Sequence, residues 1–202
     1  NELSMIADKQ GLDVWEVIRL ANRHPRVNIL QPGPGVGGHC IAVDPWFIVH
    51  GAPEESRVIR TAREVNDAKM HHVLEQATAL IEDSPEAQVA CLGLAFKANI
   101  DDFRESPARF VAARLARQFG ERIRIVEPYA KELPVEFGET GAQLVDIDTA
   151  LETCGILIVL VDHDLFRSIP EEERADDVDD ERRPRPPSGV RSRQRLERGT
   201  GE

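Results

Sequence analysis

The sequence lacks long apolar runs, paired cysteines and an excess of positive charge. No stretch approaches the length of a membrane span, and no signal peptide opens the chain. The net charge of -11 disfavours a nucleic-acid partner and an anionic membrane surface. Cys40, Cys91 and Cys154 are widely spaced and odd in number, so we expect no disulfide framework or CxxC redox pair. A reducing, cytoplasmic location is expected instead.

The remaining composition is typical of a globular protein. Hydrophobic residues make up 41% of the 202 residues, enough for one large or two small domains with a core. Changes in pattern predict a helical region over residues 1–83 and an α/β region over residues 84–170. Cys91 and Cys154 lie in apolar runs of the second region, where core packing explains both.

Two short helices are predicted at the start of the first region. The first ends at Gly11, and its apolar residues share one face: Leu3, Ile6 and Ala7. Asp13 and Glu16 have the spacing of a capping box for a second helix over residues 14–22. A loop follows from His24 to about Asp44.

A long amphipathic helix is predicted over residues 55–82. Its apolar stripe repeats at helical spacing: Val58, Ala62, Val65, Val73, Ala77 and Leu80. The stripe fits two interpretations, packing against the core of the same chain or packing against a second copy in a dimer.

Strands alternate with helices in the second region. Four apolar segments predict strands: residues 88–94, 123–126, 143–145 and 155–161. Two segments between them predict helices: residues 107–119, with Ser106 as N-cap and Pro107 in the first turn, and residues 148–153. The last strand is apolar at nearly every position, as expected where both faces are covered. This order predicts a parallel, Rossmann-like sheet, although no GxGxxG motif is present.

A glycine-rich loop carries the most informative residues. Four glycines occupy the six positions from Gly33 to Gly38, and Cys40 and Asp44 follow. Glycines let a backbone approach a ligand closely, and a cysteine at the loop's exit is placed to reach that ligand. A simple turn with a buried cysteine is the alternative. His39, Cys40 and Asp44 without a second cluster make a poor metal site, so we expect no metal.

The motifs around this loop resemble a known family. Arg26, together with GVGGHCIAVDPWF over residues 35–47, resembles the catalytic-cysteine loop of the UDP-glucose/GDP-mannose dehydrogenase family. The variant GGHCIAVDPWF is most similar to the branch that acts on UDP-N-acetyl-D-mannosamine. A second cluster, FKANIDDFRESP over residues 96–107, resembles the family's FK-x6-R-x-SP motif. The resemblance runs from Asn1 to about Arg167.

The resemblance implies a role for each matching residue. Cys40 would be the catalytic nucleophile, also in contact with the cofactor, and Asp44 the acid beside it. Arg104 would reach NAD. The implied contacts to the UDP-sugar substrate are Arg26, Gln31, Pro32, Gly33, Pro34, Gly35, Val36, Gly37, Phe96 and Lys97. Without the family, Lys97 is equally well interpreted as a solvated loop lysine.

The implied reaction is the NAD-dependent oxidation of the C6 alcohol of a UDP-sugar to a carboxylate, for surface polysaccharide. Cys40 would attack the intermediate aldehyde, and the adduct would be oxidised to a thioester. UDP-N-acetylglucosamine and UDP-glucose remain alternative substrates. Similar family members dimerise through the middle region, which favours a homodimer or higher oligomer here.

The family's NAD domain, catalytic lysine and catalytic asparagine precede the part that matches. We therefore expect the N-terminal NAD domain to be absent and the chain alone to be inactive. A UDP-sugar-binding, dimerising remnant without turnover is the alternative of a different class.

The end of the chain, residues 171–202, differs from the rest. Acidic residues gather in residues 176–181 and arginines in residues 182–198, with almost no apolar side chains. Such a composition predicts disorder, with anion binding by the arginines as the alternative. The segment does not resemble the family, which suggests a frameshift or a wrong gene end.

Overall fold

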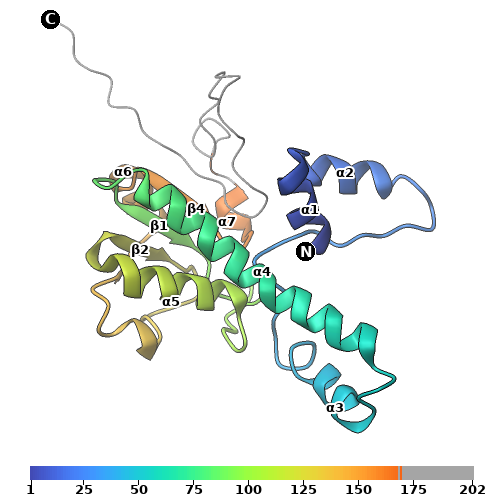
Figure 1. Cartoon of the computed structure of the whole chain (residues 1–202). Coiled ribbons are helices and arrows are strands. Elements are labelled where there is room, and N and C mark those ends of the chain that lie inside the picture. Colours follow the sequence, from blue (N-terminus) through green and yellow to red (C-terminus); the bar gives the residue numbers. More distant parts are fainter. Residues whose placement is uncertain (168, 170–202) are drawn as a thin grey trace, which may run out of the picture.

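The structure is a computed structural model and describes residues 1–167 and residue 169. The predictions for residues 171–202 therefore lie outside the described residues. Figure 1 shows a sheet flanked by helices, with a helical extension on one side. The helices are α1 (Glu2–Gln10), α2 (Val14–Ala21), α3 (Asp44–Gly51), α4 (Arg57–Glu82), α5 (Pro107–Phe119), α6 (Ile147–Thr153) and α7 (Asp164–Arg167). The strands are β1 (Val89–Leu92), β2 (Ile123–Val126), β3 (Gln143–Leu144) and β4 (Ile156–Val159).

The four strands form one parallel sheet in the order β3-β2-β1-β4, which confirms the predicted α/β class. The chain adds β2 and β3 on one side of β1, then crosses through α6 to place β4 on the other side. The carboxyl ends of β1 and β4 therefore meet where the strand order reverses. Open α/β sheets bind their ligands at this position.

Alternate residues of β1 pack into two separate cores. Val89 and Cys91 belong to the cluster shared with α4 and α5, and Ala90 and Leu92 to the cluster shared with α6 and α7. Because both faces are covered, the strands are apolar at consecutive positions. Cys91 and Cys154 are both free and buried, as expected. Burial, and next the nearby Cys154, raises the pKa of Cys91 to about 12.

Helix α4 is the longest element and connects the two regions (Figure 1). It begins at Arg57 rather than at residue 55. Val73 and Ala77 are fully buried against the sheet core, whereas Val58 near the other end is 82% exposed. Core packing therefore explains the second half of the predicted stripe, whereas in the first half Val58 and Ala62 are exposed and Val65 is half-buried.

The predicted apolar face of α1 is buried only at Ala7. Ser4 and Ala7 are buried, whereas Leu3 and Ile6 are 44% and 46% exposed. The reason is that α1 packs on a polar part of α4, where His72 Nε2 lies 3.1 Å from Asp8 Oδ2. Polar contacts thus decide which side of α1 faces inward.

Local sequence signals, such as capping residues, predicted where most of the helices begin. Asp13 caps α2 by accepting hydrogen bonds from two backbone N–H groups, although Glu16 pairs with Arg19 and does not complete the capping box. Ser106 caps α5 by accepting from the Arg109 N–H at 3.2 Å. Helices α3 and α7 were not predicted. The residues of α3, DPWFIVHG, are almost all apolar and show no helical stripe.

Candidate functional site

The glycine loop packs directly on the segment between β1 and α5. A Cβ atom added to Gly37 would lie 2.2 Å from the carbonyl oxygen of Glu105 and 2.6 Å from Cδ of Pro107. At Gly38, which has a φ of 92°, an added Cβ would lie 3.0 Å from the ring of Phe96. These contacts bring together the two motifs that are distant in the sequence.

Hydrogen bonds to two asparagines fix the backbone of the glycine loop. Asn66, buried on α4, accepts a hydrogen bond from the Val36 N–H at 2.7 Å and donates to the Val36 carbonyl at 3.2 Å. Asn1 donates to Asn66 at 3.0 Å and accepts from the Gly33 N–H at 3.1 Å. A hollow of about 530 Å³ opens beside both asparagines, between the start of α1 and the first half of α4.

Cys40 lies at the exit of this loop and its side chain is exposed. Its carbonyl oxygen accepts hydrogen bonds from the N–H groups of Val43 at 3.0 Å and Asp44 at 2.8 Å. The turn so formed leads into α3, and Asp44 lies in the first turn of that helix, where a carboxylate opposes the positive end of the helix dipole. Cys40 is therefore a surface thiol, and not the buried turn residue of the alternative interpretation.

Arg104 lies close enough to Cys40 for an electrostatic interaction, but its main partner is Asp102. Its Nε donates to Asp102 Oδ1 at 2.9 Å and its Nη2 donates to Oδ2 at 2.5 Å. The side-chain and backbone hydrogen bonds from Arg104 lower the pKa of Asp102 to about 2. His39 contributes weakly to the same shift. An anion that binds Arg104 would have to share it with Asp102.

The pairing of Arg104 with Asp102 predicts an acid-shifted titration. We expect the Asp102 carboxyl to titrate near pH 2 in the folded chain and at a higher pH in Arg104→Gln, still below its ordinary 3.8 because the backbone N–H of residue 104 continues to donate to it. Because the folded-state pKa is lowered, the pair stabilises the fold above about pH 4, and this contribution is lost between about pH 4 and pH 2. Carboxyl chemical shifts in ¹³C NMR measure both midpoints. An unchanged midpoint in the variant would contradict the assignment.

Phe96 and Lys97 lie in the loop after β1, four and five residues beyond the end of the strand. The Phe96 N–H donates to the Asp102 carbonyl at 3.1 Å, which closes the segment into a loop, and the Phe96 ring is half-buried against the glycine loop. The Lys97 side chain is exposed. The structure thus gathers the glycine loop, Cys40, the β1 end and Arg104 in one place.

Arg26 and Gln31 are both exposed, and none of the contacts given above involves either side chain. Arg26 is exposed in the turn that follows α2. The segment after α2 lies at the outer edge of the helical extension, away from the sheet (Figure 1). The backbone N–H of Arg26 donates to His24 Nδ1 at 3.2 Å. Gln31 is exposed at the start of the loop.

Within residues 1–167 and 169, no group of three His, Cys, Asp or Glu side chains could hold a metal ion.

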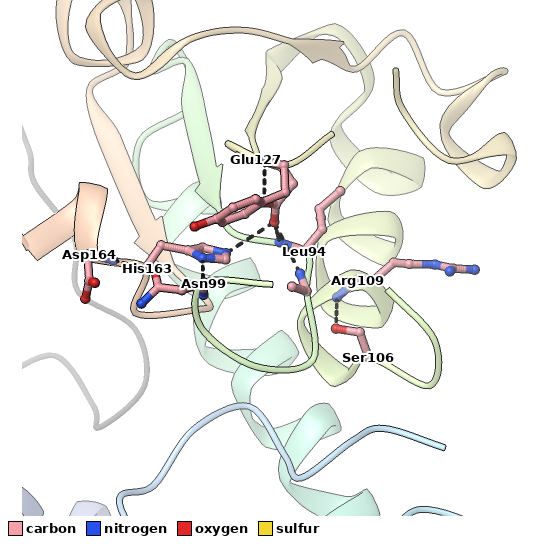
Figure 2. Close-up of polar contacts among 9 residues, drawn as sticks. Leu94, Asn99, Ser106, Arg109, Glu127, His163 and Asp164 are labelled. Atoms are coloured by element: carbon pink, nitrogen blue, oxygen red, sulfur yellow. Dashed lines mark hydrogen bonds and ion pairs between the residues drawn. The ribbon is translucent and has the colours of Figure 1, made fainter. Parts of the chain in front are cut away.

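Sequence reasoning missed the residues that support the site. Asn66 had one weak signal, a polar residue with low helix propensity inside a long helix. Glu127, the residue after β2, and His163, four residues after β4, hold the loop that follows β1 from the opposite side (Figure 2). Their position after strands of a parallel sheet was the available signal.

In the described part of the chain, no helix is both long and apolar enough to cross a membrane.

Comparison with known proteins identifies relatives along most of the chain. The model of the UDP-glucose/GDP-mannose dehydrogenase family, central domain, matches residues 1–68, and that of the family's UDP binding domain matches residues 90–184. The second match extends beyond Arg167, where the resemblance was expected to stop. This extension weakens the expectation that the end of the chain is foreign to the family.

Two curated relatives have nearly equal similarity. The UDP-N-acetyl-D-mannosamine dehydrogenase of Salmonella typhi is 54% identical over 178 residues, covering 84% of this chain and 42% of the relative. The NDP-N-acetyl-D-galactosaminuronic acid dehydrogenase of Ralstonia nicotianae is 56% identical over 169 residues, covering 84% of this chain and 40% of the relative. The chain thus spans about two fifths of the length of these relatives.

Solved structures agree with this assignment. The UDP-D-ManNAc dehydrogenase of Pyrococcus horikoshii superposes with a TM-score of 0.71 at 32% identity, covering 85% of this chain and 39% of that one. The UDP-N-acetyl-mannosamine dehydrogenase of Staphylococcus aureus gives 0.68 at 36% identity, with 85% and 39% covered. The matched sequence, the parallel sheet and the joined motifs lead to one conclusion: the chain belongs to the UDP-glucose/GDP-mannose dehydrogenase family.

Proposed function

We propose that this chain supplies the nucleophile and the UDP-sugar site of an NAD-dependent UDP-N-acetyl-D-mannosamine 6-dehydrogenase that serves surface polysaccharide synthesis. One observation carries the proposal: the loop that ends at Cys40 packs on the segment that carries Phe96 and Lys97. A nucleotide held at the β1 end can therefore present its sugar to the thiol.

Each residue has a chemical task in this proposal. Lys97 would pair with the diphosphate, and Phe96 and the loop from Gln31 to Gly37 would enclose the nucleotide and sugar. The Cys40 thiolate would attack the C6 aldehyde to form a C–S bond, and a proton would convert the carbonyl oxygen to a hydroxyl. After oxidation of this thiohemiacetal to a thioester, water would break the C–S bond and release the carboxylate and the thiol. Asp44 would order the water.

Arg104 is the described residue that best fits contact with NAD. Its guanidinium is exposed and lies near Cys40. The β1 end of the sheet does not fit a dinucleotide, because the N–H groups there already bind the Glu127 carboxylate. NAD, when bound, would accept the hydride in each of the two oxidations.

The sugar of the substrate has several candidate configurations. The relative from Ralstonia nicotianae is named for N-acetyl-galactosaminuronic acid, and it is as similar as the mannosamine enzyme from Salmonella typhi. A UDP-N-acetylgalactosamine-type substrate is therefore the second candidate, besides UDP-N-acetylglucosamine and UDP-glucose. Competition among these sugars for the binding of labelled UDP-N-acetyl-D-mannosamine discriminates between them.

We also propose that the chain acts as a homodimer or higher oligomer in the cytoplasm. The first half of α4 and the outer face of α1 leave Val58, Leu3 and Ile6 exposed, which supports association through this region. The three free cysteines support a reducing compartment. Sedimentation velocity over a range of concentrations tests the oligomer, and a monomer at all concentrations would contradict it.

The binding half of the proposal predicts the effect of removing Lys97. We expect isothermal titration calorimetry to show UDP binding to the chain, and Lys97→Ala to weaken it about tenfold through loss of the pairing with the diphosphate. Lys9→Ala is the matched control, because Lys9 is an exposed lysine in the last turn of α1. No binding of UDP to the unmodified chain, or equal affinity in Lys97→Ala, would contradict the proposed site.

A further inference from the structure

A buried carboxylate holds the amino end of the loop that carries Phe96 and Lys97. Glu127, immediately after β2, accepts hydrogen bonds on one oxygen from the N–H groups of Leu94 at 2.6 Å and Ala95 at 3.2 Å. Its other oxygen accepts from the Tyr129 N–H at 3.1 Å. Burial alone would raise the pKa of Glu127, but the facing His163 imidazole and the hydrogen bonds from backbone N–H groups outweigh it and lower that pKa. Glu127 is therefore an anion at neutral pH.

A buried histidine holds the same loop two residues beyond Lys97. His163 follows β4 and is 1% exposed. Its Nδ1 accepts from the Asn99 N–H at 2.9 Å, so in the neutral ring the proton sits on Nε2, which lies 3.4 Å from Glu127 Oε2. Asn99 in turn accepts from the Asp164 N–H at 3.0 Å. Figure 2 shows these groups converging from the ends of β2 and β4 on the loop after β1.

The loop needs such support because its own backbone is irregular. Asn99 has a φ of 63°, an uncommon conformation for a residue other than glycine. The only side chains on the loop that face a ligand in the proposed function are those of Phe96 and Lys97, which lie between the two held points. Three N–H groups on the loop would lose their partners if Glu127 and His163 were replaced by apolar residues.

We propose that Glu127 and His163 are positioning residues, which fix the loop from Leu94 to Asn99 so that Phe96 and Lys97 meet the nucleotide in a preformed arrangement. The proposal deepens the proposed function and rests on it for the identity of the ligand. In many nucleotide-binding sheets the N–H groups after the first strand bind the phosphates of the ligand. Here a protein carboxylate binds them, so the nucleotide must be recognised by the side chains of the loop.

Variants at His163 separate positioning from general stability. His163→Leu removes the acceptor for the Asn99 N–H, whereas His163→Asn can place its side-chain oxygen near the position of Nδ1. Glu127→Gln presents an amide N–H₂ where one oxygen now accepts. Glu139→Gln is the control, because Glu139 is exposed and precedes the amino end of β3, at the opposite edge of the sheet.

Two measurements at a temperature where all variants are folded decide the matter. Amide hydrogen exchange by NMR should show faster exchange at Leu94, Ala95 and Asn99 in Glu127→Gln and His163→Leu, and slower exchange at Asn99 in His163→Asn than in His163→Leu. UDP affinity should fall on the order of tenfold in Glu127→Gln and in His163→Leu, and it should recover in His163→Asn. Glu139→Gln should match the unmodified chain in both.

The possible failures are distinguishable. Unchanged exchange at these amides would overturn the proposal, as would altered exchange with unchanged UDP affinity. Failure of the unmodified chain to bind UDP would instead contradict the proposed function, and with it the use of the held loop for a nucleotide. The exchange rates would still establish whether Glu127 and His163 hold the loop.

Discussion

Gly37→Ala is expected to lower the free energy of unfolding by about 2 kcal/mol or more and to weaken UDP binding. The added methyl group would lie 2.2 Å from the Glu105 carbonyl and 2.6 Å from the Pro107 ring. Neither neighbour is the free end of a flexible side chain. The glycine loop must therefore move away from the start of α5, which separates the two motifs of the proposed site.

Gly33→Ala is the matched control for this experiment. Gly33 lies in the same loop, but an added Cβ would have no atom within 4 Å. Urea unfolding should show a lower free energy of unfolding, and so a lower midpoint, for Gly37→Ala. For Gly33→Ala the free energy of unfolding should lie within about 0.5 kcal/mol of that of the unmodified chain, or slightly higher. Equal midpoints for both would mean that the loop does not press on α5.

Cys40→Ser is expected to abolish carboxylate formation, by on the order of 10³-fold or more, in an enzyme that joins this chain to an NAD domain. A serine hydroxyl is far less ionised than a thiol at neutral pH, and it cannot supply the thioester. The product is measured as uronic acid per NADH formed. Full turnover to the acid by this variant would remove Cys40 from the mechanism.

The chain by itself provides a control for the same residue. Cys40 is exposed while Cys91 and Cys154 are buried, so a thiol reagent should label one cysteine rapidly. This fast reaction should be absent in Cys40→Ser and unchanged in Cys154→Ala. Rapid labelling of a second thiol would show that the fold opens near one of the buried cysteines.

Much of the fold could be predicted from the sequence because its signals are local. The caps at Asp13 and Ser106 and the apolar strands depend on neighbouring residues and on burial from both sides. The inward face of α1 could not be predicted, because it depends on a contact between Asp8 and His72, which lies on a helix far along the chain. Helix α3 was missed because its four large apolar residues, Trp46 to Val49, are consecutive, so that no periodicity distinguishes helix from loop.

The candidate site, like the fold, could be predicted only in part. The resemblance named Cys40, Phe96, Lys97 and Arg104, whose motifs are contiguous, and the structure places them near one another. It did not name Asn66, Glu127 or His163, whose contacts join residues 30 to 64 positions apart. Long-range hydrogen bonds leave no pattern in a single sequence. Arg26 remains a prediction, since its turn lies apart from the cluster.

Helix α4 has a mechanical consequence. Its 26 residues form an unbroken rod of about 39 Å at a rise of 1.5 Å per residue. Asn66, partway along the helix, is hydrogen-bonded to the glycine loop. Ile81, near the end of the helix, is fully buried in the sheet core. A hinge between the cysteine loop and the sheet would require this rod to bend. The thiol and the nucleotide loop should therefore travel as one body during any opening and closing, with their separation preserved.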